Sequence, residues 1–183
     1  IAHRDDGTRR EISRRQLYAD VSLMVQALVH AGVKEGDRIG AIVTHDIEAV
    51  VGYLATSAIG AIWSSCSPDF GPAGASDRLS QIDPKILIAV PEYGYAGKRI
   101  DVGPTIRAVV ESAAPQKILL IGGVVPASLS DLGCVTLHDF VSPFEPGEIA
   151  FNRLPVKAPL AILYSSGTTG KPKCITHSGG GLL

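Results

Sequence analysis

The amino-acid sequence predicts an α/β fold, in which a mostly parallel sheet is flanked by helices. Segments whose apolar residues recur at helical spacing alternate along the chain with short apolar runs, and the intervals between them suit strand–helix–strand crossovers. The short runs, such as residues 86–90, are apolar throughout rather than at every second position, which is typical of strands buried on both faces. The 183 residues provide room for one domain of this kind.

The first predicted helix begins after Ser13, because Ser13-x-x-Gln16 has the form of a capping box. Apolar residues follow at helical spacing, and Gly32 is placed to end the helix; they are Leu17, Val21, Met24 and Leu28. The elements expected after it are a strand at 36–43, a helix capped by Asp46 and reaching 59, an apolar run at 61–63, a helix at 73–82, a strand at 85–90, a helix at 105–112 and a strand at 117–121.

Residues 122–158 differ from the rest, because prolines interrupt them and few periodic signals remain. They are expected to form a long connection with little regular structure and at most a short strand near Val135–Leu137. A last apolar strand is predicted at 159–164. The chain thus divides into crossover units at 1–121, a proline-rich connection at 122–158, and a strand with its following loop at 159–183.

Composition excludes several classes of function. Lysine plus arginine is 17 and aspartate plus glutamate is 18, so a net charge of −1 offers no basis for binding nucleic acid or an anionic membrane. No apolar run approaches the roughly 20 residues that span a bilayer. Cys66, Cys134 and Cys174 lie far apart, and the five histidines lack ligand spacing, so we expect a reduced, cytoplasmic protein without a metal site. Because Ile1 is not methionine, we also expect a piece of a longer polypeptide.

The most informative segment follows the last predicted strand: Tyr164 to Lys173 reads YSSGTTGKPK. Glycines let the backbone approach an anion, hydroxyls donate hydrogen bonds and lysines supply charge, so the segment suits the cradling of phosphate. A Walker A loop is excluded, because only two residues separate Gly167 from Gly170 and a proline follows Lys171.

The same string resembles the phosphate-loop signature of the adenylate-forming superfamily of acyl-CoA synthetases, [YF]-[ST]-S-G-[ST]-T-G-x-P-K, at every position. Two upstream strings, GAIWSSCSPDFG at 60–71 and DRLSQIDPK at 77–85, resemble the acetoacetyl-CoA synthetase branch of that superfamily. Acetyl- and propionyl-CoA synthetases are similar in register but usually carry other residues at 63–65. The resemblance covers the chain almost end to end and implies part of the large N-terminal domain of such a ligase.

The resemblance also implies a reaction. A short carboxylic acid, acetoacetate in this branch, would attack the α-phosphate of Mg²⁺-bound ATP to give an acyl-adenylate and pyrophosphate, and CoA would then displace AMP. Catalytic and metal-binding residues would lie in a downstream part of the polypeptide that this chain lacks, so none is assigned here. The residues implied to hold the β- and γ-phosphates are Ser165, Ser166, Gly167, Thr168, Thr169, Gly170 and Lys173.

Several roles stay open at this stage. Lys173 would add charge at the phosphates or fix the loop by pairing with a carboxylate, whereas Lys171 occupies a variable position. His177 fits either a ligand-lining or a structural role, and Trp63 either the core or a pocket wall. Lys98 and Arg99 are interpreted as a solvated pair rather than as CoA ligands, and Cys66 and Cys174 as buried thiols. The alternatives to a ligase are a non-catalytic nucleotide-binding module on the same scaffold and an unrelated phosphate-binding hydrolase.

Overall fold

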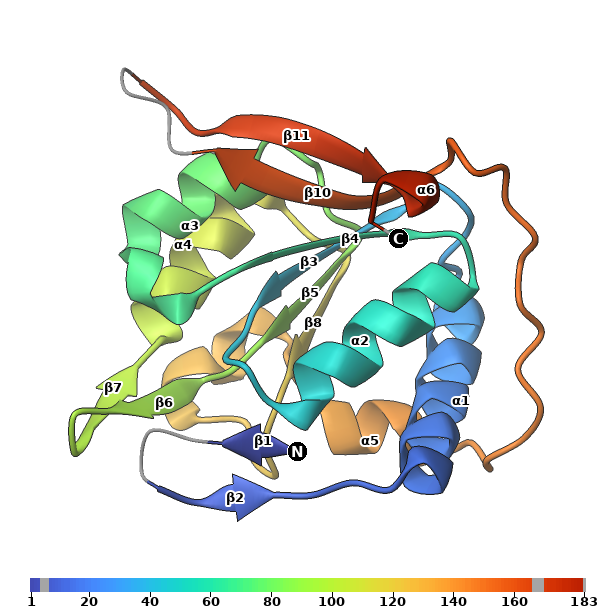
Figure 1. The fold of residues 1–183 in the computed structure, drawn as a ribbon. Helices are drawn as coiled ribbons and strands as arrows, with labels where there is room; N and C mark the ends of the chain where they lie inside the picture. Colours follow the sequence, from blue (N-terminus) through green and yellow to red (C-terminus); the bar gives the residue numbers. More distant parts are fainter. Residues whose placement is uncertain (4–6, 166–169, 183) are drawn as a thin grey trace.

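A seven-stranded sheet forms the centre of the computed structural model, which describes residues 1–3, 7–165 and 170–182 (Figure 1). The strand order is β11-β10-β4-β3-β5-β8-β9, and neighbouring strands are parallel except for β10 and β11. The strands are β3 (Arg38–Ile42), β4 (Ile62–Cys66), β5 (Ile86–Ala89), β8 (Lys117–Leu120), β9 (Val135–Thr136), β10 (Pro159–Ser165) and β11 (Lys173–Ser178). The predicted α/β class with a mostly parallel sheet is therefore confirmed.

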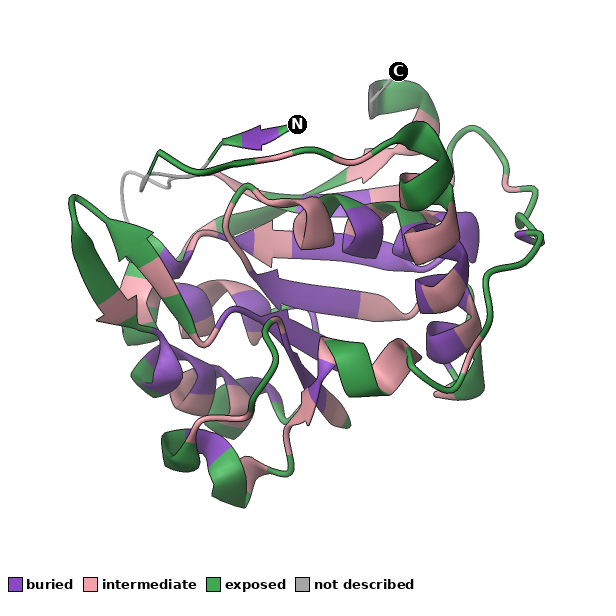
Figure 2. Cartoon of the chain, turned by 90° about the horizontal axis from the view of Figure 1, so that it is seen from below, coloured by how far each residue is buried: buried purple, intermediate pink, exposed green. Residues whose placement is uncertain are grey.

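Helices cover both faces of this sheet, so the apolar strands are buried from two sides (Figures 1 and 2). One core lies between the sheet and helices α1 (Arg14–His30) and α2 (Ile47–Ala58). A second core lies on the opposite face, under α3 (Gly71–Leu79) and α4 (Gly103–Ala113). Parallel strands joined by such crossover helices end at one common edge of the sheet, and this arrangement positions the site described below.

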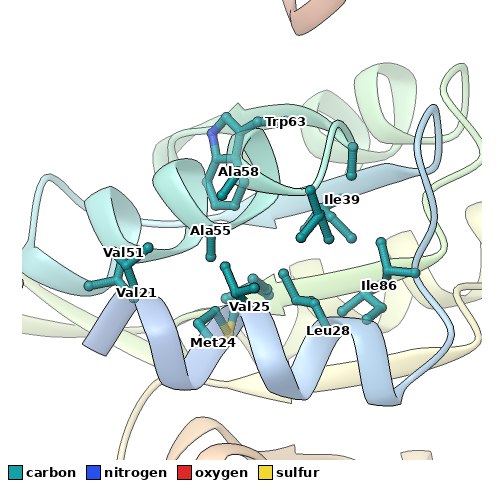
Figure 3. Close-up of a cluster of buried hydrophobic side chains, with 14 of the residues drawn as sticks. Val21, Met24, Val25, Leu28, Ile39, Val51, Ala55, Ala58, Trp63 and Ile86 are labelled. Carbon is teal, nitrogen blue, oxygen red and sulfur yellow. The ribbon is translucent and has the colours of Figure 1, made fainter. Parts of the chain in front are cut away.

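Helix α1 forms where its cap and apolar stripe predict. The Ser13 hydroxyl accepts a hydrogen bond of 3.1 Å from the Gln16 backbone N–H, while the Gln16 side chain donates to Asp20 rather than back to the cap. Of this stripe, Val21, Met24 and Leu28 are buried in the core shared with α2 (Figure 3), and Leu17 is half-buried. Burying one such Leu or Met side chain contributes about 1.5–3 kcal/mol. Helix α2 begins at the predicted cap, Asp46, whose carboxylate accepts from the Ile47 N–H at 2.8 Å.

Short polar hairpins are present that periodicity did not predict. β1 (Ala2–His3) pairs with β2 (Arg9–Arg10), and β6 (Glu92–Tyr95) pairs with β7 (Lys98–Asp101). Lys98 and Arg99, interpreted above as a solvated pair, are the first two residues of strand β7. The turn between β6 and β7 is formed by Ala96 and Gly97, both with positive φ, as a two-residue hairpin turn requires. These short, mostly exposed strands have no continuous apolar face, so hydrophobic periodicity could not predict them.

The proline-rich connection contains more structure than expected. Besides the predicted short strand, β9, it carries a 3-10 helix, η2 (Ala127–Leu132), and helix α5 (Leu137–Val141), whose cap is Thr136. Its later part is tied to α1 and to the end of α2. Ser22 Oγ donates a hydrogen bond to the Gly147 carbonyl and accepts one from the Gly147 N–H, both at 2.9 Å. Asn152 Nδ2 donates to the Ile59 carbonyl at 2.8 Å. These bonds return the chain to the edge of the sheet, where β10 adds to β4.

Two short elements complete the described chain: the 3-10 helix η1 (Pro68–Phe70), before α3, and α6 (Gly179–Leu182), after β11. Among the described residues, none of the helices combines the length and the hydrophobicity needed to cross a membrane.

Candidate phosphate-binding edge of the sheet

The hydroxyl-rich segment lies at the carboxyl edge of the sheet. β10 runs parallel to β4, and β4 runs parallel to β3, so the three strands end on the same side. Ser165, the last residue of β10, is half-buried at that edge. In open α/β sheets this is the edge at which ligands bind.

Each predicted site residue has a definite place or lies outside the described residues. Ser166, Gly167, Thr168 and Thr169 lie outside them. Gly170 is exposed with φ of +103°, a backbone conformation that favours glycine. Lys173 opens strand β11 directly opposite Ser165 and is exposed. We call the end of β10, at 164–165, the incoming limb of the segment, and residues 170–173, which lead into β11, its outgoing limb. The Ser165 hydroxyl and the Lys173 ammonium group thus lie where the two limbs meet the sheet.

The incoming limb is held in place by the hydroxyl groups of Ser64, on β4, and Tyr164, on β10. Ser64 Oγ lies 2.8 Å from the Ile162 carbonyl oxygen and 2.9 Å from Tyr164 Oη. One hydroxyl carries one hydrogen, so Ser64 donates to the carbonyl and accepts from the tyrosine. Burial raises the pKa of Tyr164 to about 12, so it stays a neutral donor at physiological pH. Tyr164 is therefore a structural anchor at the end of β10.

A guanidinium group lies beside this anchor. Arg78 of α3 stacks on Phe70, with Cζ 3.8 Å from the ring centroid, and its Cζ is 6.0 Å from the centroid of Tyr164. Its Nη1 donates to the Gly74 carbonyl at 2.7 Å. The ion pairs among the described residues do not include Arg78. Arg78 thus adds positive charge to this end of the sheet.

The outgoing limb contacts the end of α3. Gln81 Nε2 donates to the Pro172 carbonyl at 2.9 Å and to the Asp77 carbonyl at 2.5 Å. Lys171 Nζ lies 3.7 Å from Asp77 Oδ1; the lysine side chain is largely exposed and that of Asp77 about half exposed. These contacts were missed from the sequence, although the string at 77–85 had been singled out for its resemblance, because spacing alone does not say what a helix end touches.

The other candidates separate into core, surface and distant residues. Trp63 is buried beside Tyr53, as a core aromatic. Arg99 is exposed and pairs with Glu92 at 2.5 Å, as a surface pair would. His177 is half-buried and lies four residues along β11 from Lys173, which is about 13 Å at a strand rise of about 3.3 Å per residue.

The two cysteines near the segment differ from each other. Cys66 is buried, and burial raises the pKa of its thiol to about 12, so it is no nucleophile at neutral pH. Cys174 was expected to be buried as well, and that expectation was wrong. It lies on the edge strand β11, which has a neighbour on one side only, and its side chain is exposed. Partial desolvation still raises the pKa of the Cys174 thiol.

In the described part of the chain, His, Cys, Asp and Glu side chains do not gather in groups of three or more that could hold a metal ion. The groups that do gather at this edge are hydroxyls, lysines and an arginine. They equip it to bind an anion rather than to attack an electrophile.

Comparison with known proteins places this edge in context. The model of the AMP-binding enzyme family matches residues 1–183. The chain is 49% identical over 170 residues to the acetoacetyl-coenzyme A synthetase of Rhizobium meliloti (strain 1021), and this match covers 92% of the chain and 26% of that protein. It is 38% identical over 181 residues to the acetoacetyl-CoA synthetase of Mus musculus, covering 94% and 27%. The chain thus spans about a quarter of the length of these relatives.

Solved structures agree with the sequence comparison. Acetoacetyl-CoA synthetase from Streptomyces lividans superposes with a TM-score of 0.86 at 32% identity, over 94% of this chain and 26% of that one. The anthranilate CoA ligase AuaEII superposes with a TM-score of 0.75 at 22% identity, which supports a shared fold alone.

Proposed function

This chain belongs to the AMP-binding enzyme family, and on that premise we propose that it is the phosphate-binding part of an acetoacetyl-CoA synthetase. The whole protein would convert a short carboxylic acid, acetoacetate, to an acyl-adenylate and then to the CoA thioester. ATP enters as its Mg²⁺ complex, and AMP and pyrophosphate leave. This chain would correspond to part of the large N-terminal domain.

The observation that carries the proposal is the position of the string at 164–173. It joins two neighbouring strands, β10 and β11, at the carboxyl edge of the sheet, where the fold binds ligands. A hairpin connection between β10 and β11 does not by itself require four hydroxyl side chains and two lysines, so their presence there favours anion binding over a purely structural scaffold. The 49% identity to an acetoacetyl-CoA synthetase supports acetoacetate as the acid substrate.

Within this chain the proposed ligand is the pyrophosphate part of ATP. Ser165, Ser166, Thr168 and Thr169 would donate hydroxyl hydrogen bonds, and Gly167 and Gly170 would let backbone N–H groups approach the β- and γ-phosphates. Lys173 would add charge where the outgoing limb meets the sheet. Phosphate and adenylate transfers need positioning and charge stabilisation above all, which such donors supply.

The test is ATP–pyrophosphate exchange by the whole protein that carries these residues, with acetoacetate, acetate and propionate as acids. We expect exchange with all three and the highest kcat/KM with acetoacetate. A preference for acetate or propionate would move the protein to the acetyl- and propionyl-CoA synthetase branch. If the folded protein catalyses no exchange with any of these acids, and consumes neither ATP nor CoA in their presence, the ligase proposal itself is contradicted.

A further inference from the structure

The end of helix α3 contacts both limbs of the segment that joins β10 to β11. Arg78 lies beside Tyr164, on the incoming limb, and Gln81 and Asp77 touch Pro172 and Lys171 on the outgoing limb. Residues three and four positions apart share one side of a helix and of the turn that ends it, so 77, 78 and 81 form one surface. We call these three residues the α3 seat.

Gln81 makes the most specific of these contacts. Its amide nitrogen carries two hydrogens, and the two acceptors are the Asp77 carbonyl, 2.5 Å away in the same helix end, and the Pro172 carbonyl, 2.9 Å away. The first bond fixes the side chain, so that the second holds the outgoing limb against a rigid support. Because proline has a fixed φ and no N–H, one bond to its carbonyl orients this part of the backbone.

Arg78 contributes less directly. Its guanidinium is held in place by the Phe70 ring and the Gly74 carbonyl, and it approaches Tyr164 only to 6.0 Å, the outer limit of a cation–π contact. The Lys171–Asp77 pair spans 3.7 Å between side chains that are 74% and 43% exposed, and exposed pairs of this kind contribute little. The hydrogen bond from Gln81 is therefore the principal contact of the seat.

We propose that Gln81 is a positioning residue for the phosphate-binding segment, with Arg78 supporting the opposite limb. The contact between Gln81 and Pro172 is independent of the proposed function, whereas its effect on catalysis rests on that function. Fixing a stretch of backbone costs conformational entropy, and the bond from Gln81 holds Pro172 in place before the phosphates bind, which lowers the entropy cost of binding. Loss of the seat lowers the rate of adenylate formation without changing how the acid is bound.

The direct test is hydrogen exchange with single-amide resolution in the whole protein, for Gln81→Ala and for the control Gln116→Ala. Gln116 is exposed, and its side chain makes no hydrogen bond within the part of the chain that the structure describes. In Gln81→Ala, amides at 164–165 and 173–174 exchange about fivefold faster, as loss of one hydrogen bond predicts, while 161–162 and 176–177 keep their rates. Gln116→Ala matches the wild type throughout.

Two further variants keep the test decisive. Gln81→Glu has the same shape but no donor, so it reproduces the faster exchange even if the alanine variant does not fold. Gln81→Lys restores a donor and returns the exchange rates toward the wild type. Unchanged exchange at the loop end of the hairpin in folded Gln81→Ala and Gln81→Glu overturns the inference.

The functional consequence is measured separately by ATP–pyrophosphate exchange. Gln81→Ala lowers kcat about tenfold, whereas the KM for the acid stays within twofold, because the misplaced segment contacts phosphate and not the acid. An equal kcat in Gln81→Ala and wild type contradicts the positioning role. If the wild-type protein exchanges pyrophosphate with none of the acids, the proposed function fails, and hydrogen exchange still decides whether Gln81 holds the limb.

Discussion

The benzene edge of the Trp63 indole lies directly against the backbone of helix α2 at Gly52. A Cβ at residue 52 would stand 2.9 Å from both Cζ3 and Cη2 of the ring. Apolar carbons pack at about 3.5–4.0 Å, so only glycine allows this approach. The contact brings α2 close to β4, the strand on which β10 is added.

The substitution Gly52→Ala is therefore expected to destabilise the protein by about 1 kcal/mol, the difference between two opposing effects. Alanine favours a helix over glycine by about 1 kcal/mol, but crowding a buried indole costs about 1–3 kcal/mol. Urea unfolding followed by far-UV circular dichroism measures the change, because this signal is also available for variants that lack the single tryptophan. Gly179→Ala, where an added Cβ meets nothing within 4 Å, is the control. If Gly52→Ala destabilises the wild type but not the Trp63→Leu variant, the loss is assigned to this contact, whereas equal stability of Gly52→Ala and wild type would contradict it.

Asp37 predicts a dependence of stability on pH. Burial acts to raise the pKa of Asp37, but hydrogen bonds from Lys85 Nζ at 2.7 Å and the Lys34 N–H at 2.8 Å outweigh it and lower the pKa below 3.8. A carboxyl with a lowered pKa stabilises the fold above its unfolded-state pKa, and this stabilisation is lost as pH falls through the folded-state value.

Asp37→Asn should accordingly cost about 1 kcal/mol at pH 7, and the difference from wild type should shrink below pH 3.8. Urea unfolding at pH 7 and pH 3 measures both differences. Asp83→Asn is the matched control, because that side chain is 88% exposed and its pair with Arg38 contributes little. A difference that grows toward low pH would show that the sign is wrong.

Thiol reactivity should separate the cysteines. In the native protein at pH 8, Cys174 is expected to react with iodoacetamide at least about a hundredfold faster than Cys66, because only Cys174 is exposed and the pKa of Cys66 is about 12. Peptide mass spectrometry after timed labelling measures the ratio. In urea the two rates should converge. Comparable native rates would mean that the carboxyl end of β4 opens readily.

The loop hydroxyls should act on the phosphates rather than on the acid. In the whole protein, Thr168→Ala or Thr169→Ala is expected to lower the rate of ATP–pyrophosphate exchange about tenfold or more, with the KM for acetoacetate within about twofold. Ser178→Ala, at the far end of β11, is the control. A raised KM for the acid at unchanged kcat would place these threonines in the acid pocket instead.

Elements whose signal is local could be predicted from the sequence. Ser13 and Asp46 cap α1 and α2 as predicted, because a cap needs only its own next turn. Runs such as 85–90 became buried parallel strands, because continuous apolarity leaves a short segment no exposed face. The string at 164–173 predicts an anionic ligand, since glycines, hydroxyls and lysines carry that chemistry wherever they are placed, and this stays a prediction.

Tertiary structure alone decided which residues meet across long stretches of chain. The pairing of β11 with β10, the exposure of Cys174 and the bond from Gln81 to Pro172 all depend on the edge at which β10 joins the sheet. Ninety-one positions separate Gln81 from Pro172, and no periodicity within either segment encodes their contact. Local patterns state what a residue can do, whereas packing around the whole sheet decides which partner it reaches.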